Sequence, residues 1–140
     1  MSDNTNLEMD TKRQHLIKGF YDYINNEEEF CKDNELLLEL IPKLLKLQND
    51  KGRLYGRSFL KHGDISVFMN VERKFDRISN IMTKAMREGT DSLHTSDSST
   101  PTETFLDTII DLGMYSLMWA GYIKETHPEE FEAFINSNNL

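Results

Sequence analysis

Apolar residues recur at helical spacing through most of this 140-residue chain, and no stretch alternates between apolar and polar positions as a half-buried strand does. Pro42 interrupts one of the periodic segments and predicts a kink, or two short helices that meet there. We therefore expect an all-α protein with four to five helices in a bundle. The predicted helices cover about residues 11–25, 34–48, 64–88, 100–122 and 128–138.

The segment 100–122 carries the strongest helix-start signal. Thr100 can cap the helix, Pro101 suits its first position, and Glu103 completes a capping box. The following residues are apolar on most sides, which is typical of a buried central helix. Glu103, Asp107 and Asp111 nevertheless recur every fourth residue, so three carboxylates share one edge. Because like charges at that spacing repel, we expect a positive group to face them.

A second acidic edge lies on the helix predicted after Asp64. Its apolar positions form a stripe of 3.6-residue period, and Glu72, Asp76 and Asn80 run beside that stripe. The basic residues between these positions would also suit a series of salt bridges on the helix surface. Two helices that each offer carboxylates four residues apart can hold Mg²⁺, a hard cation that prefers oxygen ligands. The candidate metal ligands are Glu72, Asp76, Asp107 and Asp111.

The segment from Lys51 to Gly63 differs from the rest of the chain. It contains basic, aromatic and glycine residues and no acidic residue. A loop of this kind can bind phosphate through arginine and stack a base on an aromatic ring. A solvated connection that pairs with acidic neighbours would have the same composition, and the sequence leaves both readings open.

Composition limits the function further. The chain has 24 acidic and 16 basic residues, a net charge of −8, which disfavours a coat on nucleic acid or on an anionic membrane. The single cysteine, Cys31, excludes an internal disulfide framework and favours a reduced, cytoplasmic setting. No apolar run approaches the roughly 20 residues of a membrane span. We expect a single domain over 1–140, with a flexible tail at 1–8 and a mobile Ser/Thr-rich loop at 89–100.

Three blocks of the sequence resemble a known family. YGRSF at 55–59, VERKFDRISNIM at 71–82 and DTIIDLGMYSLM at 107–118 are similar to the phage-associated nucleotide modification associated domain, type one. The helical core of that family is similar to the all-α nucleoside triphosphate pyrophosphohydrolases of the MazG and dimeric dUTPase kind. The resemblance covers about residues 45–123. It implies a nucleotide site between the two long helices and the YGRSF loop, and a homo-oligomer, either a dimer or a tetramer.

The resemblance also selects residues. The matching positions are Tyr55, Gly56 and Ser58 in the loop block, Lys74, Phe75 and Arg77 in the middle block, and Asp107, Asp111, Leu112 and Tyr115 in the last. Together with the basic loop, they give the candidate nucleotide-binding residues Tyr55, Arg57, Ser58, Lys74, Arg77 and Tyr115. The chain departs from the MazG-type pattern on both metal helices. Glu72 and Asp76 are four residues apart where those enzymes carry an E-x-x-E pair, and Thr108 stands where they carry a metal-binding glutamate. Met114 also stands where the closer family has asparagine.

Three functions therefore remain open. The first is a nucleotide-binding protein of this helical class that acts on or holds a phosphorylated nucleotide. If it is an enzyme, it would hydrolyse a nucleoside triphosphate to a monophosphate and pyrophosphate with Mg²⁺. The second is a non-catalytic sponge that sequesters a nucleotide immune signal in the host cytoplasm, if the chain is phage-encoded. The third is a helical interaction protein without a small ligand.

Overall fold

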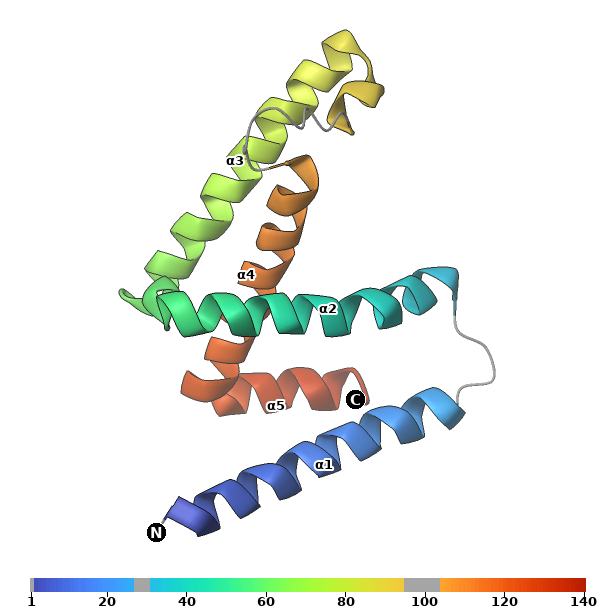
Figure 1. Cartoon of the computed structure of the whole chain (residues 1–140). Coiled ribbons are helices and arrows are strands. Elements are labelled where there is room, and N and C mark those ends of the chain that lie inside the picture. The colour runs from blue at the N-terminus through green and yellow to red at the C-terminus, as the bar shows by residue number, and fades with distance from the viewer. Residues whose placement is uncertain (1, 27–30, 95–103) are drawn as a thin grey trace. The chain divides into compact units, whose positions relative to one another are not determined.

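The computed structural model describes residues 2–26, 31–94 and 104–140, and within these ranges it contains helices and no strand (Figure 1). The predicted all-α class is confirmed. No helix in these ranges is both long enough and apolar enough to cross a membrane. The α-helices are α1 (Ser2–Asn26), α2 (Lys32–Tyr55), α3 (Asp64–Glu88), α4 (Phe105–Thr126) and α5 (Pro128–Ser137), and two short 3₁₀ helices are η1 (Ser58–Leu60) and η2 (Thr90–Leu93).

The chain divides into two compact units, residues 1–47 and 48–140, and the single domain over 1–140 stays a prediction. The first unit holds α1 and the larger part of α2. Helix α1 begins at Ser2, whereas the sequence predicted a tail over residues 1–8. No glycine or proline occurs in residues 2–9, so nothing there interrupts the helix.

Helix α2 is longer than its apolar pattern predicts. It runs as one helix through Pro42 and includes residues 51–55, the first part of the predicted basic loop. Basic residues suit this last turn because they interact favourably with the negative end of the helix dipole. Gly56 then ends the helix with φ of 58°, and its N–H bonds to the carbonyl of Gly52 at 2.9 Å. Only residues 56–63 remain as the connection to α3, and they include η1.

Helices α3 and α4 lie side by side in the second unit and supply its buried residues (Figure 1). Val67, Lys74 and Ala85 lie on one face of α3, at spacings of seven and eleven residues, and are buried with Thr108 of α4. The predicted apolar stripe of α3 is confirmed in part, because Ala85 is buried and Val71, Ile78 and Met82 are half-buried. Its rings Phe68 and Phe75 lie about a quarter turn from Val67 and are exposed. If the expected homo-oligomer forms, which stays a prediction, these rings are available to contact a second copy.

The start of α4 differs from the prediction. Thr100, Pro101 and Glu103 lie outside the described residues, and α4 begins at Phe105 with Thr104 as its cap. The N–H of Asp107 donates to the Thr104 hydroxyl at 3.1 Å, and the N–H of Thr104 donates to the Asp107 carboxylate at 2.9 Å. The capping box is thus formed four residues later than predicted. Part of the predicted 89–100 loop is also regular, because residues 90–93 form η2 against α3.

The start of α3 packs against the second half of α4. Gly63 has φ of 59°, and a Cβ atom added there would lie 3.1 Å from the hydroxyl of Tyr122. Beside it, the indole N–H of Trp119 donates a hydrogen bond to Asp64 at 2.6 Å. Trp119 and Tyr122 are therefore half-buried residues that orient α3 on α4.

We predict that Gly63→Ala lowers the free energy of unfolding by about 1–3 kcal/mol, because alanine is strained at this positive φ and its methyl group crowds Tyr122. Urea denaturation followed by circular dichroism measures the effect. Gly52→Ala is the matched control, since nothing lies within 4 Å of its added Cβ and its φ is helical. Equal stability of wild type and Gly63→Ala would contradict the packing described here.

Candidate functional site

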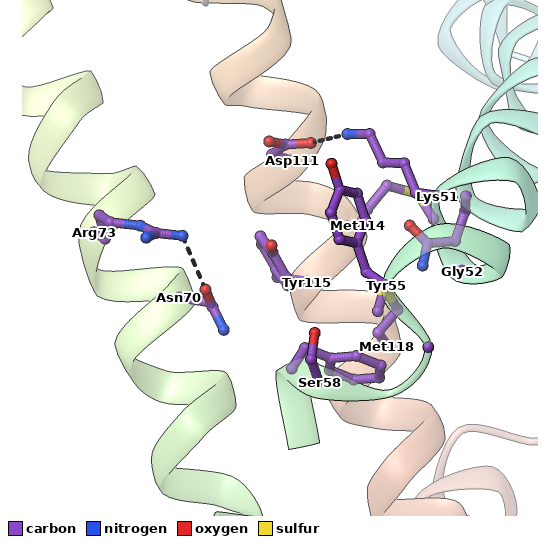
Figure 2. A pocket seen from close by; sticks show the side chains of 13 residues that line it. Lys51, Gly52, Tyr55, Ser58, Asn70, Arg73, Asp111, Met114, Tyr115 and Met118 are labelled. Carbon is purple, nitrogen blue, oxygen red and sulfur yellow. Dashed lines mark hydrogen bonds and ion pairs between the residues drawn. The ribbon is translucent and has the colours of Figure 1, made fainter. Parts of the chain in front are cut away.

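A pocket of about 470 Å³ lies within the second unit, between the last turn of α2, η1, α3 and α4 (Figure 2). Its wall combines aromatic rings, methionines, amides and charged groups. The lining residues are Gln48, Lys51, Gly52, Tyr55, Gly56, Ser58, Phe59, Asn70, Arg73, Asp111, Met114, Tyr115 and Met118. A concave, mixed surface with a few converging polar groups is the usual form of a small-molecule site.

The central charged group of this pocket is Asp111 on α4. The ammonium of Lys51 donates to one of its carboxylate oxygens at 2.8 Å, and that of Lys74 pairs with the other at 2.9 Å. Lys51 comes from α2 and Lys74 from α3, so this ion pair joins three helices. Lys74 is only 8% exposed, which is rare for a lysine unless a carboxylate accompanies it. The positive group expected opposite the acidic edge of α4 is confirmed.

The two lysines also set the protonation of Asp111. Burial alone raises the pKa of a carboxylate because it disfavours the charged form. The hydrogen bonds and charges of Lys51 and Lys74 outweigh that effect, and they hold the pKa of Asp111 below its ordinary value. Asp111 is therefore ionised near neutral pH, with both of its oxygens occupied.

Asp107 has a different role. Its carboxylate accepts hydrogen bonds from the hydroxyl and the N–H of Thr104, at 2.7 and 2.9 Å, and these bonds lower the pKa of Asp107. A carboxylate in the first turn also interacts favourably with the positive end of the helix dipole. Asp107 thus caps α4 and does not line the pocket.

The four candidate metal ligands do not come together. Glu72 and Asp76 are exposed on α3 and line a different hollow, which also includes Ser58 and His62. Across the ranges 2–26, 31–94 and 104–140, no three His, Cys, Asp or Glu side chains are placed to hold one metal ion. With Asp107 in a capping box and Asp111 paired to two lysines, these residues do not fit the Mg²⁺ centre that the sequence suggested.

The candidate nucleotide-binding residues lie in three different places. Tyr55, Ser58 and Tyr115 line the pocket. Arg57 points elsewhere, because its guanidinium forms a two-pronged ion pair with Glu125 at 3.2 and 2.5 Å. Lys74 and Arg77 line a neighbouring hollow on α3.

Two cations of the pocket were absent from the predicted set. Lys51 belongs to the basic segment, yet its pairing with Asp111, 60 residues later, has no sequence signal. Arg73 donates to the amide oxygen of Asn70 at 3.0 Å, and Figure 2 shows both side chains extending from α3. The spacing of Asn70, Arg73 and Arg77 places them on one helix face and could have identified Arg73.

We predict that Asp111→Asn lowers the free energy of unfolding by about 1–3 kcal/mol, because it removes the shared partner of two lysines and leaves the ammonium of Lys74 buried without that charge. Chemical denaturation at neutral pH measures the loss. Asp50→Asn, at an exposed position beside Lys51, is the matched control. An unchanged or increased stability of Asp111→Asn would show that the repulsion along α4 outweighs the ion pair.

The pH dependence of that difference follows from the lowered pKa. A carboxylate whose pKa is lower in the folded state contributes stability above its unfolded pKa of about 3.9, and that contribution disappears as pH falls through the folded value. The stability difference between wild type and Asp111→Asn should therefore be largest above about pH 5 and shrink as the pH approaches 3. A difference that grows on acidification would contradict this assignment.

Comparison with known proteins adds one relationship. No protein-family model matches the chain, and no solved structure matches it. The chain is 28% identical over 127 residues to the Gene 30 protein of Bacillus phage SP01. The match covers 83% of this chain and 56% of the phage protein, so the chain spans little more than half the length of that relative. The chain is thus similar to a phage protein, and its membership of the nucleotide modification associated domain family stays a prediction.

Proposed function

We propose that this protein binds a phosphorylated nucleotide in the pocket beside Asp111 and holds it without hydrolysing it. The observation that carries the proposal is which charged groups of the pocket are already paired. The pocket's one carboxylate among the described lining residues is already paired with two lysines, whereas the guanidinium of Arg73 is bonded only to the neutral amide of Asn70. The site therefore offers a surplus of positive charge.

Arg73 is suited to a phosphate. A guanidinium presents several N–H donors in a planar fork, and it binds phosphate oxygens through paired, charge-assisted hydrogen bonds. The Ser58 hydroxyl of η1 and the Asn70 amide of α3 also line the pocket and can add neutral hydrogen bonds. The net charge of −8 over the whole chain opposes a long polyanion, so a small phosphorylated ligand fits better than a nucleic acid.

The apolar part of the pocket is suited to a base. The rings of Tyr55, Phe59 and Tyr115 line it, together with the thioethers of Met114 and Met118. Stacking a base on an aromatic ring contributes about 1–3 kcal/mol and depends little on which base is present. Tyr55 is 70% exposed, so a stacked base would bury ring surface that is now in contact with solvent.

The carboxylates support holding rather than hydrolysis. A pyrophosphohydrolase of the kind considered above uses free carboxylates to place Mg²⁺ against the phosphates. Here Asp107 accepts the capping hydrogen bonds of α4, and Asp111 is paired with two lysine ammonium groups. Glu72 and Asp76 lie outside the pocket. A pocket that contains basic residues and aromatic rings but no carboxylates free to bind Mg²⁺ can sequester a nucleotide. Because the chain is similar to a phage protein, we propose that it acts in an infected cell.

A binding assay tests the proposal. We expect one or more nucleotides from a panel of monophosphates, triphosphates and cyclic nucleotides to be depleted from solution in equilibrium dialysis. Arg73→Gln should weaken that binding by roughly tenfold or more, because it removes a charge-assisted bond to phosphate. Arg87→Gln is the control, since it removes the same charge from an exposed position of α3 outside the pocket.

The fate of the ligand distinguishes the three functions. Recovery of intact nucleotide after the protein is denatured supports sequestration. Release of pyrophosphate that requires Mg²⁺ and disappears in Asp111→Asn would establish hydrolysis instead. Failure of every nucleotide in the panel to bind would reject the proposal and favour a helical interaction protein.

A further inference from the structure

Arg73 lies at a position from which its side chain can reach more than one concave surface. It lines the pocket, and it also lines two neighbouring hollows on α3. Both neighbouring hollows contain Asp76, and one of them contains Glu72 as well. The side chain of Arg73 is long and exposed, so packing alone does not fix its direction. A specific contact is needed to hold the guanidinium in the pocket.

Asn70 supplies that contact. An N–H of the Arg73 guanidinium donates to the amide oxygen of Asn70 at 3.0 Å (Figure 2). The amide nitrogen of Asn70 donates in turn to the backbone carbonyl of Ser66, one turn earlier on α3, at 3.0 Å. Because the amide has one nitrogen and one oxygen, this second bond leaves the oxygen to face Arg73. Asn70 is half-buried and lines the pocket, so the bond it accepts keeps the guanidinium there.

Asp76 is the competing partner for Arg73. Asn70 and Asp76 lie three residues before and three residues after it, and residues at this spacing are neighbours on a helix surface. Asp76 lines both hollows outside the pocket and does not line the pocket. An ion pair with Asp76 would therefore turn the guanidinium away from a ligand. In the described part of the chain, the guanidinium bonds to Asn70 instead.

We propose that Asn70 is a positioning residue, which holds the guanidinium of Arg73 in the pocket and away from Asp76. Asn70 thereby raises the affinity for a phosphorylated ligand through Arg73, because a side chain that is already ordered loses less entropy when the ligand binds. The inference rests on the proposed function, since it concerns the same phosphate contact. It adds that the charge of Arg73 is not sufficient without its neutral neighbour.

A double-mutant cycle of Asn70 and Arg73 tests the inference. Equilibrium dialysis gives the dissociation constants of the mono- and triphosphates of adenosine, guanosine, cytidine and uridine, of their cyclic nucleotides, and of the corresponding nucleosides. Asn70→Ala should weaken each nucleotide that binds the wild type by roughly threefold to tenfold, because the guanidinium is no longer ordered. Nucleosides should change by less than about twofold, since they lack the phosphate. Alanine favours the helix, and circular dichroism checks the fold.

The same substitution is then made in the Arg73→Gln variant. There Asn70→Ala should change nucleotide affinity by less than about twofold, because no guanidinium remains to be positioned. A hydrogen bond from Asn70 to the ligand itself would persist in this background. The cycle therefore separates a positioning residue from a residue that contacts the ligand.

The carboxylate of Asp76 provides an independent test. In the Asn70→Ala variant, Asp76→Asn should restore nucleotide affinity by about twofold, since it removes the competing partner at helical spacing. In the wild type the same substitution should have a smaller effect, because Asn70 already holds Arg73. Glu72→Gln is the matched control. It removes the same charge beside Arg73, but adjacent residues of a helix do not face each other.

Three results would overturn the inference and leave the proposed function intact. The first is unchanged nucleotide affinity in Asn70→Ala. The second is an equal loss from Asn70→Ala in the wild-type and Arg73→Gln backgrounds, which would show that Asn70 contacts the ligand directly. The third is equal restoration by Asp76→Asn and Glu72→Gln, which would assign the effect to the general field of the carboxylates. Failure of every nucleotide to bind the wild type would reject the proposed function itself.

Discussion

Asp111 lies between Lys51 of α2 and Lys74 of α3, and the organisation of the pocket depends on this ion pair. The two ammonium groups lie 2.8 and 2.9 Å from the carboxylate oxygens of Asp111, and these contacts join the end of α2 and the middle of α3 to α4. The pair also makes a buried lysine tolerable, because the charge of Lys74 has a carboxylate beside it. Removing either kind of charge would disturb both the packing of these helices and the wall of the pocket.

The same ion pair decides the chemistry of the site. A carboxylate whose two oxygens are each paired with a lysine ammonium group has little capacity left to bind a metal ion. The hydrogen bonds and charges of those lysines also lower the pKa of Asp111. The pocket also contains Arg73 of α3 and the rings of Tyr55 and Tyr115, which come from α2 and α4 (Figure 2). Positive charge beside aromatic rings is suited to binding a phosphorylated base. Carboxylates that already form ion pairs or capping bonds are unsuited to placing a metal ion for hydrolysis of that ligand. The proposal of sequestration rests on this pairing of the charges.

Helix content was the part of the structure that the sequence predicted well, because the apolar period of 3.6 residues is a local property. The helix ends were predicted less well. Residues 51–55 contain Gly52 and basic side chains, which are typical of a loop, yet they continue α2 until Gly56 adopts a positive φ. The cap at Thr104 has the same Thr-x-x-acid pattern as the one predicted at Thr100, so the pattern alone did not locate the first turn.

The sequence predicted the acidic edge at Asp111 but not the residues that pair with it. Periodicity placed Asp111 and Tyr115 on one edge of a helix and required a positive charge opposite them. It did not identify Lys51 or Lys74 as that charge, because the pairing depends on how three helices pack. The expected Mg²⁺ ligands were selected by spacing within each helix, and spacing does not report that a capping threonine or a lysine already occupies the carboxylate.

Phosphorus NMR of a nucleotide mixed with the protein in the presence of Mg²⁺ tests the central claim most directly. Sequestration predicts that the phosphate resonances shift or broaden on addition of the wild-type protein, recover their free positions after denaturation, and are never joined by a pyrophosphate resonance. Resonances that remain at their free positions for every nucleotide, or a pyrophosphate signal that grows with time, would contradict it.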